Sequence, residues 1–496
     1  MNIITMYTWI VITGGMFAFI AAMGIGANDV ANAYATSVGS KALTIKQAVI
    51  CATIFESSGA ILMGSHVTKT IRKGIADYEC FEDDPGALMY GCMWVCFSVG
   101  AWLFIASKYE MPVSTTHSCV GGMIGMTIAL KGTQCVNWYE TRDMFPYIGG
   151  VSGIIISWIV SPVFSAIIST SLFGLMRKFI LRSSESFNRT TYLFPVLIGT
   201  TITLNSFFII YKGAKGLGLD DTPMSQATAL SFGIGGISAL IIFPFTKKIR
   251  NNVIKSIEQK NSIINNDKVD NIEHQVSIIK NEKCCSLITH INDNFKINLN
   301  EIVSNNDDVD KIHKNAEKFE ESTEEYFKSL QIFTAMCDSF SHGANDVANA
   351  IGPFAAIYMI GRDAQVNKKN ELGNDAYWIL GLGGIGISLG LLIYGYKIMH
   401  TIGLKLCKIT PSRGVAIELS SALVIITGSR LEIPLSTTHC QIGATMGVAA
   451  LEDPYKCSGM NCKIVAKTIL GWIITLIVVG TSCGILTAQG VYAPEI

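Results

Sequence analysis

The chain has 496 residues, of which 49% are hydrophobic and only 15% are charged. This composition excludes a string of ordinary soluble domains and is typical of a polytopic membrane protein. The formal net charge is zero, and no basic run resembles a DNA-binding face, so nothing indicates a nucleic-acid partner. The 14 cysteines form no CxxC framework and most are expected to be buried, although a disulfide between Cys80 and Cys135 is possible.

The predicted elements are membrane helices. A helix needs about 20 mostly apolar residues to span a bilayer, and about a dozen segments are candidates. The first, roughly Met6 to Gly26, has no basic residue before it and runs into a polar motif, so we do not expect it to be a cleaved signal peptide. The predicted fold is therefore an all-α polytopic membrane protein. The segments are centred near Thr13, Phe55, Phe97, Met123, Ile156, Thr201, Ile234, Phe340, Ile387, Leu423, Gly443 and Val478.

A hydrophilic stretch separates the seventh segment from the eighth. It runs from Lys247 to Ser329 and holds 13 basic and 15 acidic residues, so it must lie in water. We predict a first transmembrane half at 1–246, a cytoplasmic linker at 247–329 and a second transmembrane half at 330–496. A solvated, partly disordered linker is the simplest interpretation, and a regulatory or partner-binding role is the alternative.

Two motifs occur once in each half. GANDVANA begins at Gly26 and again at Gly343, and PVSTTH at Pro112 returns as PLSTTH at Pro434. The motifs keep their order and nearly their spacing, which indicates that the two halves descend from one unit. Both motifs interrupt apolar runs with residues that are costly in hydrocarbon unless the broken backbone lines a cavity. We therefore expect broken helices or hairpins at a functional site.

Loop charges predict the orientation, because Lys and Arg favour the cytoplasmic side. The loop between the fifth and sixth segments carries Arg177, Lys178, Arg182 and Arg189 against one acid, Glu185. Placing this loop inside puts both termini outside and the linker inside. The two GANDVANA segments are seven crossings apart and so run in opposite directions, as in an inverted-topology repeat.

The PxSTTH motifs predict an anion site. Each proline ends a preceding helix, and the hydroxyl residues that follow are good N-caps for an apolar helix. A helix that begins in mid-membrane presents free N–H groups and the positive end of its dipole to an anion. The alternative is that the hydroxyls bond only to their own backbone, but two copies favour ligand binding. His117 and His439 either orient the hydroxyls or satisfy local acceptors. The predicted anion ligands are Ser114, Thr115, Thr116, Ser436, Thr437 and Thr438.

The GANDVANA motifs predict a cation site. Gly26 and Gly343 are expected to let their helices unwind, and the motif offers hard oxygen ligands, which suit a small cation such as sodium. A carboxylate inside the membrane is functional by default, and the alternative is that it only packs against a neighbouring helix. The predicted ligands are Asn28, Asp29, Asn32, Asn345, Asp346 and Asn349.

Two further acids interrupt apolar runs, and each is unique to its half. The offset that aligns the PxSTTH copies places Glu418 opposite Cys96, and an offset of 387 − 56 = 331 places Glu56 opposite Ile387. These glutamates either bind or carry a coupling ion directly or support residues that do. No Lys or Arg lies in the middle of these segments, so an anion would need helix termini, hydroxyls and co-bound cations. That requirement is typical of a symporter.

The duplicated motifs closely resemble the inorganic phosphate transporter (PiT) family, which includes sodium-phosphate and proton-phosphate symporters. The resemblance covers essentially the whole chain outside the linker. It implies an inverted repeat, with phosphate on the Ser and Thr strings and sodium near the Asn and Asp residues. Glu56 and Glu418 look like acids that sodium-coupled members need. Members are similar in having external termini and a large internal loop, and they are often homodimers.

The predicted function is import of inorganic phosphate by cation symport through alternating access, most simply with sodium, in the plasma membrane. Sodium is then a co-transported substrate, and no other cofactor is expected. The alternatives are a proton-coupled phosphate symporter and a permease for a related tetrahedral anion such as sulfate. An enzyme is not expected because neither motif has a nucleophile elbow. A channel is disfavoured because channels rely on charge rings or continuous pores.

Overall fold

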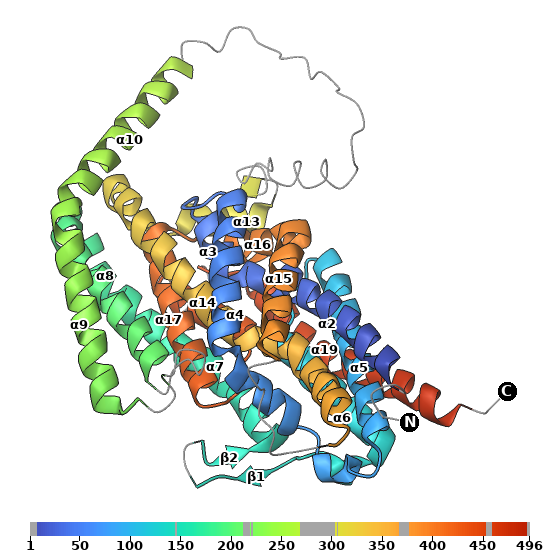
Figure 1. Cartoon of the computed structure of the whole chain (residues 1–496). Coiled ribbons are helices and arrows are strands. Elements are labelled where there is room, and N and C mark those ends of the chain that lie inside the picture. The colour runs from blue at the N-terminus through green and yellow to red at the C-terminus, as the bar shows by residue number, and fades with distance from the viewer. Residues whose placement is uncertain are drawn as a thin grey trace, which may run out of the picture.

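The computed structural model is a bundle of long helices with one short antiparallel hairpin (Figure 1). It describes residues 7–143, 146–211, 219, 222–267, 303, 304, 306–366, 376–452 and 459–493. The middle of the predicted linker, residues 268–302, lies outside the described residues.

The described part of the first half, together with the start of the predicted linker, contains fifteen elements. Asp84 caps α5, Pro85 occupies its first position, and Thr44 forms a capping box with Gln47 at the start of α4. The elements are α2 (Thr8–Asn28), α3 (Val30–Gly39), α4 (Ile45–Lys73), η1 (Tyr78–Phe81), α5 (Pro85–Lys108), α6 (Thr115–Lys131), η2 (Thr133–Cys135), β1 (Glu140–Thr141), β2 (Ile148–Gly149), α7 (Gly150–Met176), η3 (Arg177–Leu181), α8 (Ser186–Ile210), α9 (Met224–Ile242), η5 (Phe243–Phe245) and α10 (Thr246–Asp267).

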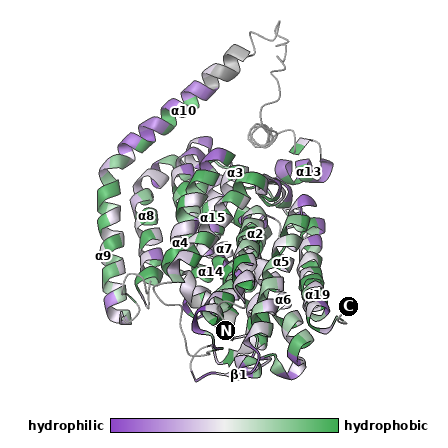
Figure 2. Cartoon of the chain, turned by 45° about the vertical axis from the view of Figure 1, so that its right-hand side comes forward, coloured by the Kyte–Doolittle hydropathy of each residue, from purple (hydrophilic) through white to green (hydrophobic). Residues whose placement is uncertain are grey.

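The second half begins within the predicted linker. Its elements are α13 (Asp307–Asn315), α14 (Glu321–Asp363), α15 (Tyr377–Tyr394), α16 (Tyr396–His400), η7 (Thr401–Leu406), α17 (Pro411–Arg430), α18 (Thr437–Ala450) and α19 (Cys462–Tyr492). The predicted boundary at residue 330 therefore falls inside α14, and Tyr326 and Phe327 are fully buried in a core cluster. At the other boundary, α9 continues through η5 into α10, which Figure 2 shows as a mostly hydrophilic helix projecting beyond the bundle.

All twelve predicted segment centres lie in helices, but only eight described stretches are long and apolar enough to cross a membrane. Four helices that contain a predicted centre lie outside those eight stretches, namely α6, α14, α17 and α18. They carry the second GANDVANA motif, the ends of both PxSTTH motifs and Glu418. Two of them are short, with 17 residues in α6 and 14 in α18. The chain is a multi-pass membrane protein, and the count of about twelve segments stays a prediction.

The motif glycines allow close helix packing rather than unwinding. A Cβ on Gly26 would lie 1.8 Å from the carbonyl oxygen of Ile387, and a Cβ on Gly343 would lie 2.2 Å from that of Glu56. The helix α14 passes through Gly343 unbroken, and α2 continues past Gly26 to Asn28. The prediction that both glycines unwind their helices is wrong. These positions need glycine because the backbone of a crossing helix leaves no room for a side chain. The one break is at Asp29, between α2 and α3.

Corresponding contacts recur in the two halves. A Cβ on Gly390 would meet the carbonyl oxygen of Met23, and a Cβ on Gly59 would meet that of Phe340. These pairs obey the same sequence offsets as the Gly26 and Gly343 contacts, since 340 − 23 = 317 and 390 − 59 = 331. The α2–α15 and α4–α14 crossings are thus built alike.

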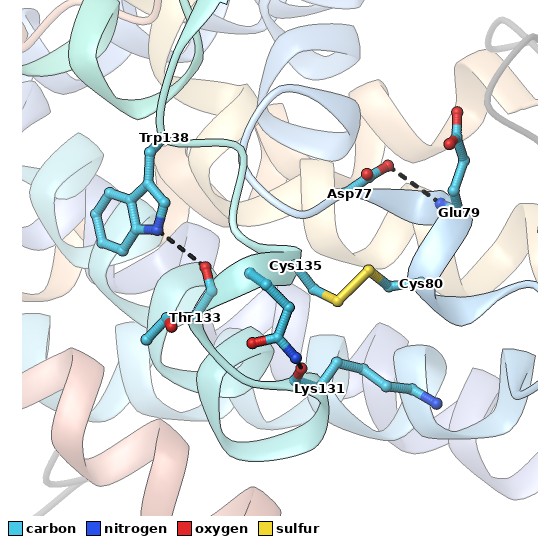
Figure 3. The surroundings of a disulfide bond; sticks show 8 residues. Asp77, Glu79, Cys80, Lys131, Thr133, Cys135 and Trp138 are labelled. Carbon is cyan, nitrogen blue, oxygen red and sulfur yellow. Dashed lines mark hydrogen bonds between the residues drawn. A yellow bond between two sulfur atoms is a disulfide. The ribbon is translucent and has the colours of Figure 1, made fainter.

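Two isolated bridges repeat this correspondence. Ala76 pairs with Val136 near the β1–β2 hairpin, and Cys407 pairs with Met460 near α13, at the opposite end of the bundle (Figure 1). Only the first is reinforced by a disulfide, between Cys80 and Cys135 in η1 and η2 (Figure 3). The disulfide that the sequence left open is therefore present, at the same end of the bundle as the described N-terminal residues.

Ionic contacts hold the end of the linker segment to the bundle. Arg177 and Arg182 approach the Glu317 carboxylate at 2.6 and 2.8 Å. Arg413 is fully buried, pairs with Glu452 at 2.5 Å and donates to the Glu317 carbonyl oxygen at 2.9 Å. We call these five residues the clasp. It joins the segment before α14 to η3, α17 and the end of α18, so this part of the predicted linker is not a free solvated chain.

Candidate functional site

The two carboxylates of the GANDVANA motifs lie together in the bundle interior. Asp29 occupies the break between α2 and α3, and Asp346 lies in the middle of α14. Both side chains have at most 1% of their surface exposed. Burying two acids without basic partners is costly, so their surroundings must either stabilise charge or invite a cation.

The PxSTTH motifs form the helix starts that the sequence predicts. Ser114 accepts from the backbone N–H of His117 at 3.2 Å, and Ser436 accepts from that of His439 at 3.3 Å. These N-caps begin α6 at Thr115 and α18 at Thr437. The helices therefore present their N-terminal turns inside the protein.

Hydroxyls of these helix starts donate to the two carboxylates. Thr115 Oγ1 lies 2.8 Å from Asp29 Oδ2, and Thr437 Oγ1 lies 2.6 Å from Asp346 Oδ2. Thr438 crosses between the halves and donates to Asp29 Oδ1 at 2.6 Å. Three predicted anion ligands and the two aspartates predicted to bind a cation thus lie in one cluster.

Thr116 makes a different contact, because its hydroxyl donates to the carbonyl oxygen of Leu435 at 2.7 Å. That bond also crosses between the halves, from α6 to the segment before α18. The extended segments before both helices are therefore interlocked at the cluster.

The motif asparagines donate into the cluster and leave their oxygens without donors. Asn32 Nδ2 lies 2.6 Å from Asp29 Oδ1, and Asn349 Nδ2 lies 3.2 Å from Asp346 Oδ1. Among the residues that the structure describes, the Oδ1 atoms of Asn32, Asn345 and Asn349 are buried and accept no hydrogen bond. A buried acceptor without a donor is unfavourable, and a cation would supply the missing partner.

Asn28 lies apart from this oxygen set. Its Oδ1 accepts from the N–H of Val113 at 2.9 Å, and its Nδ2 donates to the carbonyl oxygen of Met111 at 2.9 Å. Both ends of the amide therefore hold the segment before α6. The structure does not bring Asn28 to the carboxylates as a free ligand.

The sequence interpretation missed His342. Its Nε2 lies 2.9 Å from Asp346 Oδ2 and 3.8 Å from Asp29 Oδ1, and its Nδ1 lies 3.1 Å from Glu56 Oε2. Asp29, His342 and Asp346 bring ligand atoms within 4.8 Å of one another, so they could hold a metal ion. The available signal was spacing, because His342 precedes Asp346 by four residues and so shares its helix face. The first half has Ile25 at this position.

The two unique glutamates have different surroundings. Glu56 touches the cluster through His342 and also accepts from Ser339 at 3.1 Å. Glu418 accepts from Thr36 at 2.6 Å and from Thr334 at 2.5 Å, and within the described part of the chain neither aspartate is among its hydrogen-bond partners.

Asp338 is a second buried residue, after His342, that the sequence interpretation missed. It lies on α14 four residues before His342, is 1% exposed, and its Oδ1 has no hydrogen-bond partner within the described part of the chain. The polar face of α14 thus extends from Asp346 past His342 to Asp338.

The two motif histidines lie just behind the helix starts. The His117 ring stacks on Trp158 and the His439 ring packs on Trp472, each with centroids 3.6 Å apart. The two imidazoles are 4.7 Å from each other. His439 Nδ1 also lies 2.9 Å from the carbonyl oxygen of Trp158, so this histidine does satisfy a local acceptor.

Comparisons with known proteins match almost the whole chain. The profile of the Phosphate transporter family matches residues 25–483. A putative phosphate permease of Haemophilus influenzae is 31% identical over 480 residues, covering 96% of each chain. The rat sodium-dependent phosphate transporter 1 is 27% identical, covering 95% of this chain and 94% of its own.

A solved structure described as the sodium-dependent phosphate transporter is similar in fold as well as sequence. It is 30% identical, superimposes with a TM-score of 0.74, and the match covers 98% of this chain and 100% of that one. These proteins are transporters, in agreement with the prediction that the chain is not an enzyme. The chain therefore belongs to the phosphate transporter family.

Proposed function

We propose that this protein imports inorganic phosphate by sodium symport through alternating access. The observation that carries the proposal is the single buried cluster in which two carboxylates, three amide oxygens without donors and two helix N-termini meet. The names of the rat relative and of the solved structure include sodium dependence, which supports the choice of cation.

The oxygen atoms of the cluster fit sodium. Carboxylate and amide oxygens are hard ligands, and the two motifs contain no Lys or Arg that could neutralise the aspartates. Sodium bound at Asp29 and Asp346 would balance their charge and give the Oδ1 atoms of Asn32 and Asn349 a partner. We assign the same role to Asn345, and we assign Asn28 to holding the segment before α6.

The helix starts fit phosphate. The first turns of α6 and α18 supply N–H groups and the positive ends of two helix dipoles. The hydroxyls of Ser114, Thr115, Thr116, Ser436, Thr437 and Thr438 surround these turns. Such donors recognise a tetrahedral anion without a fixed positive side chain.

Competition for hydroxyl protons couples the two substrates. A threonine hydroxyl has one proton to donate, and Thr115, Thr437 and Thr438 donate it to carboxylates in this structure. Sodium on those carboxylates would compete for the same oxygens and release the hydroxyls for phosphate. Cation binding should therefore precede or accompany phosphate binding.

Electrostatics favour the same order. A carboxylate and an anionic phosphate oxygen about 4 Å apart repel by roughly 4 kcal/mol at an effective dielectric near 20. Sodium ions would cancel this repulsion. By linkage, phosphate should in turn tighten sodium binding by the same factor.

The recurring contacts support an inverted repeat of about twelve membrane segments, including the short helices α6 and α18. The α2–α15 and α4–α14 crossings share their offsets, and the two isolated bridges lie at opposite ends of the bundle. A disulfide at one end favours an oxidising compartment there, and the predicted orientation places that end outside and the linker inside. The homodimer implied by the resemblance stays a prediction.

The deciding experiment is uptake of radiolabelled phosphate into proteoliposomes with an inward sodium gradient, with a proton gradient and with neither. We expect accumulation above equilibrium with the sodium gradient. Accumulation only with the proton gradient would identify a proton-coupled carrier, and stronger uptake of labelled sulfate would identify a different anion. Equilibration without accumulation under any gradient would contradict symport.

A further inference from the structure

A proline in α7 frees a carbonyl group beside the proposed phosphate site. Pro162 lies inside this helix, and a proline has no N–H to donate to the carbonyl four residues earlier. That carbonyl belongs to Trp158. The Trp158 carbonyl oxygen thus lacks its usual helix donor.

His439 supplies a donor to this carbonyl. Its Nδ1 lies 2.9 Å from the Trp158 oxygen, and because a carbonyl can only accept, Nδ1 must carry the proton. The imidazole is 3% exposed, and within the described residues its Nε2 has no hydrogen-bond partner. The single directional bond of this side chain therefore goes to α7.

The bond fixes the beginning of α18. His439 directly follows Thr438, whose hydroxyl reaches Asp29. One turn later, a Cβ on Gly443 would lie 2.3 Å from the carbonyl oxygen of Pro162, so the two helices touch at the proline. The first turn of α18, with Thr437 and Thr438, is thus held against α7 beside Pro162.

The other half of the site is held differently. The contact that corresponds to Gly443 and Pro162 is between Gly121 and the carbonyl oxygen of Leu476. A leucine keeps its N–H, so α19 has no freed carbonyl at this point. Correspondingly, His117 Nδ1 is buried, and it neither donates nor accepts a hydrogen bond among the described residues.

We propose that His439 is a positioning residue for phosphate binding, acting through the Trp158 carbonyl that Pro162 frees. The inference rests on the proposed function, because it assigns the Thr437 and Thr438 side of the phosphate site a fixed anchor that the Thr115 and Thr116 side lacks. Loss of the hydrogen bond from His439 to the Trp158 carbonyl should shift the hydroxyls of α18 and weaken phosphate binding. In this proposal His439 itself touches neither substrate.

The test compares two substitutions, one of which keeps a hydrogen-bond donor and one of which removes it. Asn carries its NH₂ on Cγ, as His carries Nδ1, so His439→Asn keeps the donor, whereas His439→Phe keeps only the ring. We expect His439→Phe to raise the half-saturating phosphate concentration about 3- to 10-fold, the range for one neutral hydrogen bond. His439→Asn should stay within about twofold of the wild type. His117→Phe should have a smaller effect than His439→Phe.

A second background tests the role of the proline. Pro162→Ala restores an N–H for the Trp158 carbonyl, so adding His439→Phe there should shift phosphate affinity less than about twofold. Equal losses for His439→Phe and His439→Asn, or an undiminished loss in the Pro162→Ala background, would overturn the inference.

The melting temperature of the purified protein tests the anchor without phosphate. His439→Phe should lower it with Pro162 present and lower it less with Pro162→Ala. If the wild type failed to take up phosphate, the proposed function would fail, and the melting comparison would still decide whether His439 anchors α18. Equal melting shifts in both backgrounds would overturn the anchor.

Discussion

At the scale of single residues, the site depends on hydroxyls that can serve either a carboxylate or an anion. Thr115 and Thr437 occupy equivalent positions and donate to equivalent aspartates. We predict that Thr115→Val or Thr437→Val raises the half-saturating phosphate concentration at least about tenfold, because a hydrogen bond to a charged group contributes about 1.5 to 3 kcal/mol. Concentration dependence of uptake measures this effect.

Matched controls lie on the same two helices. Thr127 in α6 and Thr445 in α18 are buried and donate to the backbone carbonyl four residues earlier. Thr127→Val and Thr445→Val should leave the phosphate dependence within about twofold. Equal effects at the control and site positions would show that Thr115 and Thr437 have only structural roles.

The carboxylates belong to the same scale. Asp29→Asn and Asp346→Asn keep the side-chain shape and remove the charge that would hold sodium. We predict that either substitution abolishes sodium-driven accumulation and makes any remaining phosphate binding less dependent on sodium. Phosphate affinity across a sodium series, in the wild type and both variants, checks this. Full sodium-stimulated accumulation in both variants would refute the coupling role.

The repeated residues of the site and the two glutamates in apolar runs could be predicted from the sequence, whereas His342 and Asp338 were missed. Asp29, Asp346 and the threonines occur in duplicated strings, so duplication itself distinguished them from ordinary polar residues in helices. His342 and Asp338 occur once, and nothing in one sequence shows which neighbouring helix they face. The Nδ1 contact of His439 depends on a carbonyl 281 residues away in sequence, which no local pattern reveals.

At the scale of helices, the motif glycines show how a sequence pattern can suggest the wrong cause. Glycine inside a helix costs about 0.5 to 1 kcal/mol relative to alanine, which suggests a break. Here the missing side chains admit the Ile387 and Glu56 carbonyl groups of crossing helices. Only tertiary packing distinguishes these explanations. The PxSTTH helix starts, in contrast, are encoded locally by proline and a serine cap, and the structure confirms them.

The clasp is a second feature at this scale. Arg413 is 1% exposed and depends on Glu452 as its carboxylate partner. We predict that Glu452→Gln lowers the free energy of unfolding by about 3 to 5 kcal/mol, because it leaves a buried guanidinium without a counter-charge. Thermal or denaturant unfolding measures this change.

The exposed pair Lys463 and Asp308 provides the control, with side-chain exposures of 85% and 54%. Lys463→Gln should change stability by less than about 1 kcal/mol. Elsewhere in the clasp, burial alone would raise the pKa of Glu317, but the Arg182 and Arg177 guanidinium groups outweigh it and hold that pKa below its usual value. The Glu317 carboxylate therefore stays ionised at neutral pH. Equal stability losses in the two variants would contradict a structural clasp.

A further prediction concerns residues 268–302 of the hydrophilic stretch, which contain none of the clasp residues. Replacing residues 268–302 with a short flexible spacer should leave phosphate uptake within a few-fold of the wild type, because α10, α13 and the clasp are retained. Uptake normalised to the amount of inserted protein is the measurement. Loss of uptake by a well-inserted variant would assign the replaced residues to gating or assembly.

At the scale of the whole molecule, the two ends of the bundle differ in chemistry. The β1–β2 hairpin and the Cys80–Cys135 disulfide lie at one end, and α10, α13 and the clasp lie at the other (Figures 1 and 3). Loop charges predict that the disulfide end faces outward, and a disulfide persists best in an oxidising compartment. These two arguments are independent of each other.

Thiol accessibility tests this orientation directly. Glu140 on β1 and Lys255 on α10 are exposed at opposite ends. We predict that a membrane-impermeant maleimide labels Glu140→Cys in intact cells and labels Lys255→Cys only after permeabilisation. Both substitutions would be made in an otherwise identical background in which Cys462, an exposed cysteine, is replaced by serine. Each variant must retain phosphate uptake, so that the labelled protein is the folded carrier. The reverse pattern would place the disulfide in the cytoplasm and contradict the orientation inferred from the charges. Labelling of both sites in intact cells would show that the two ends do not lie on opposite sides of the membrane.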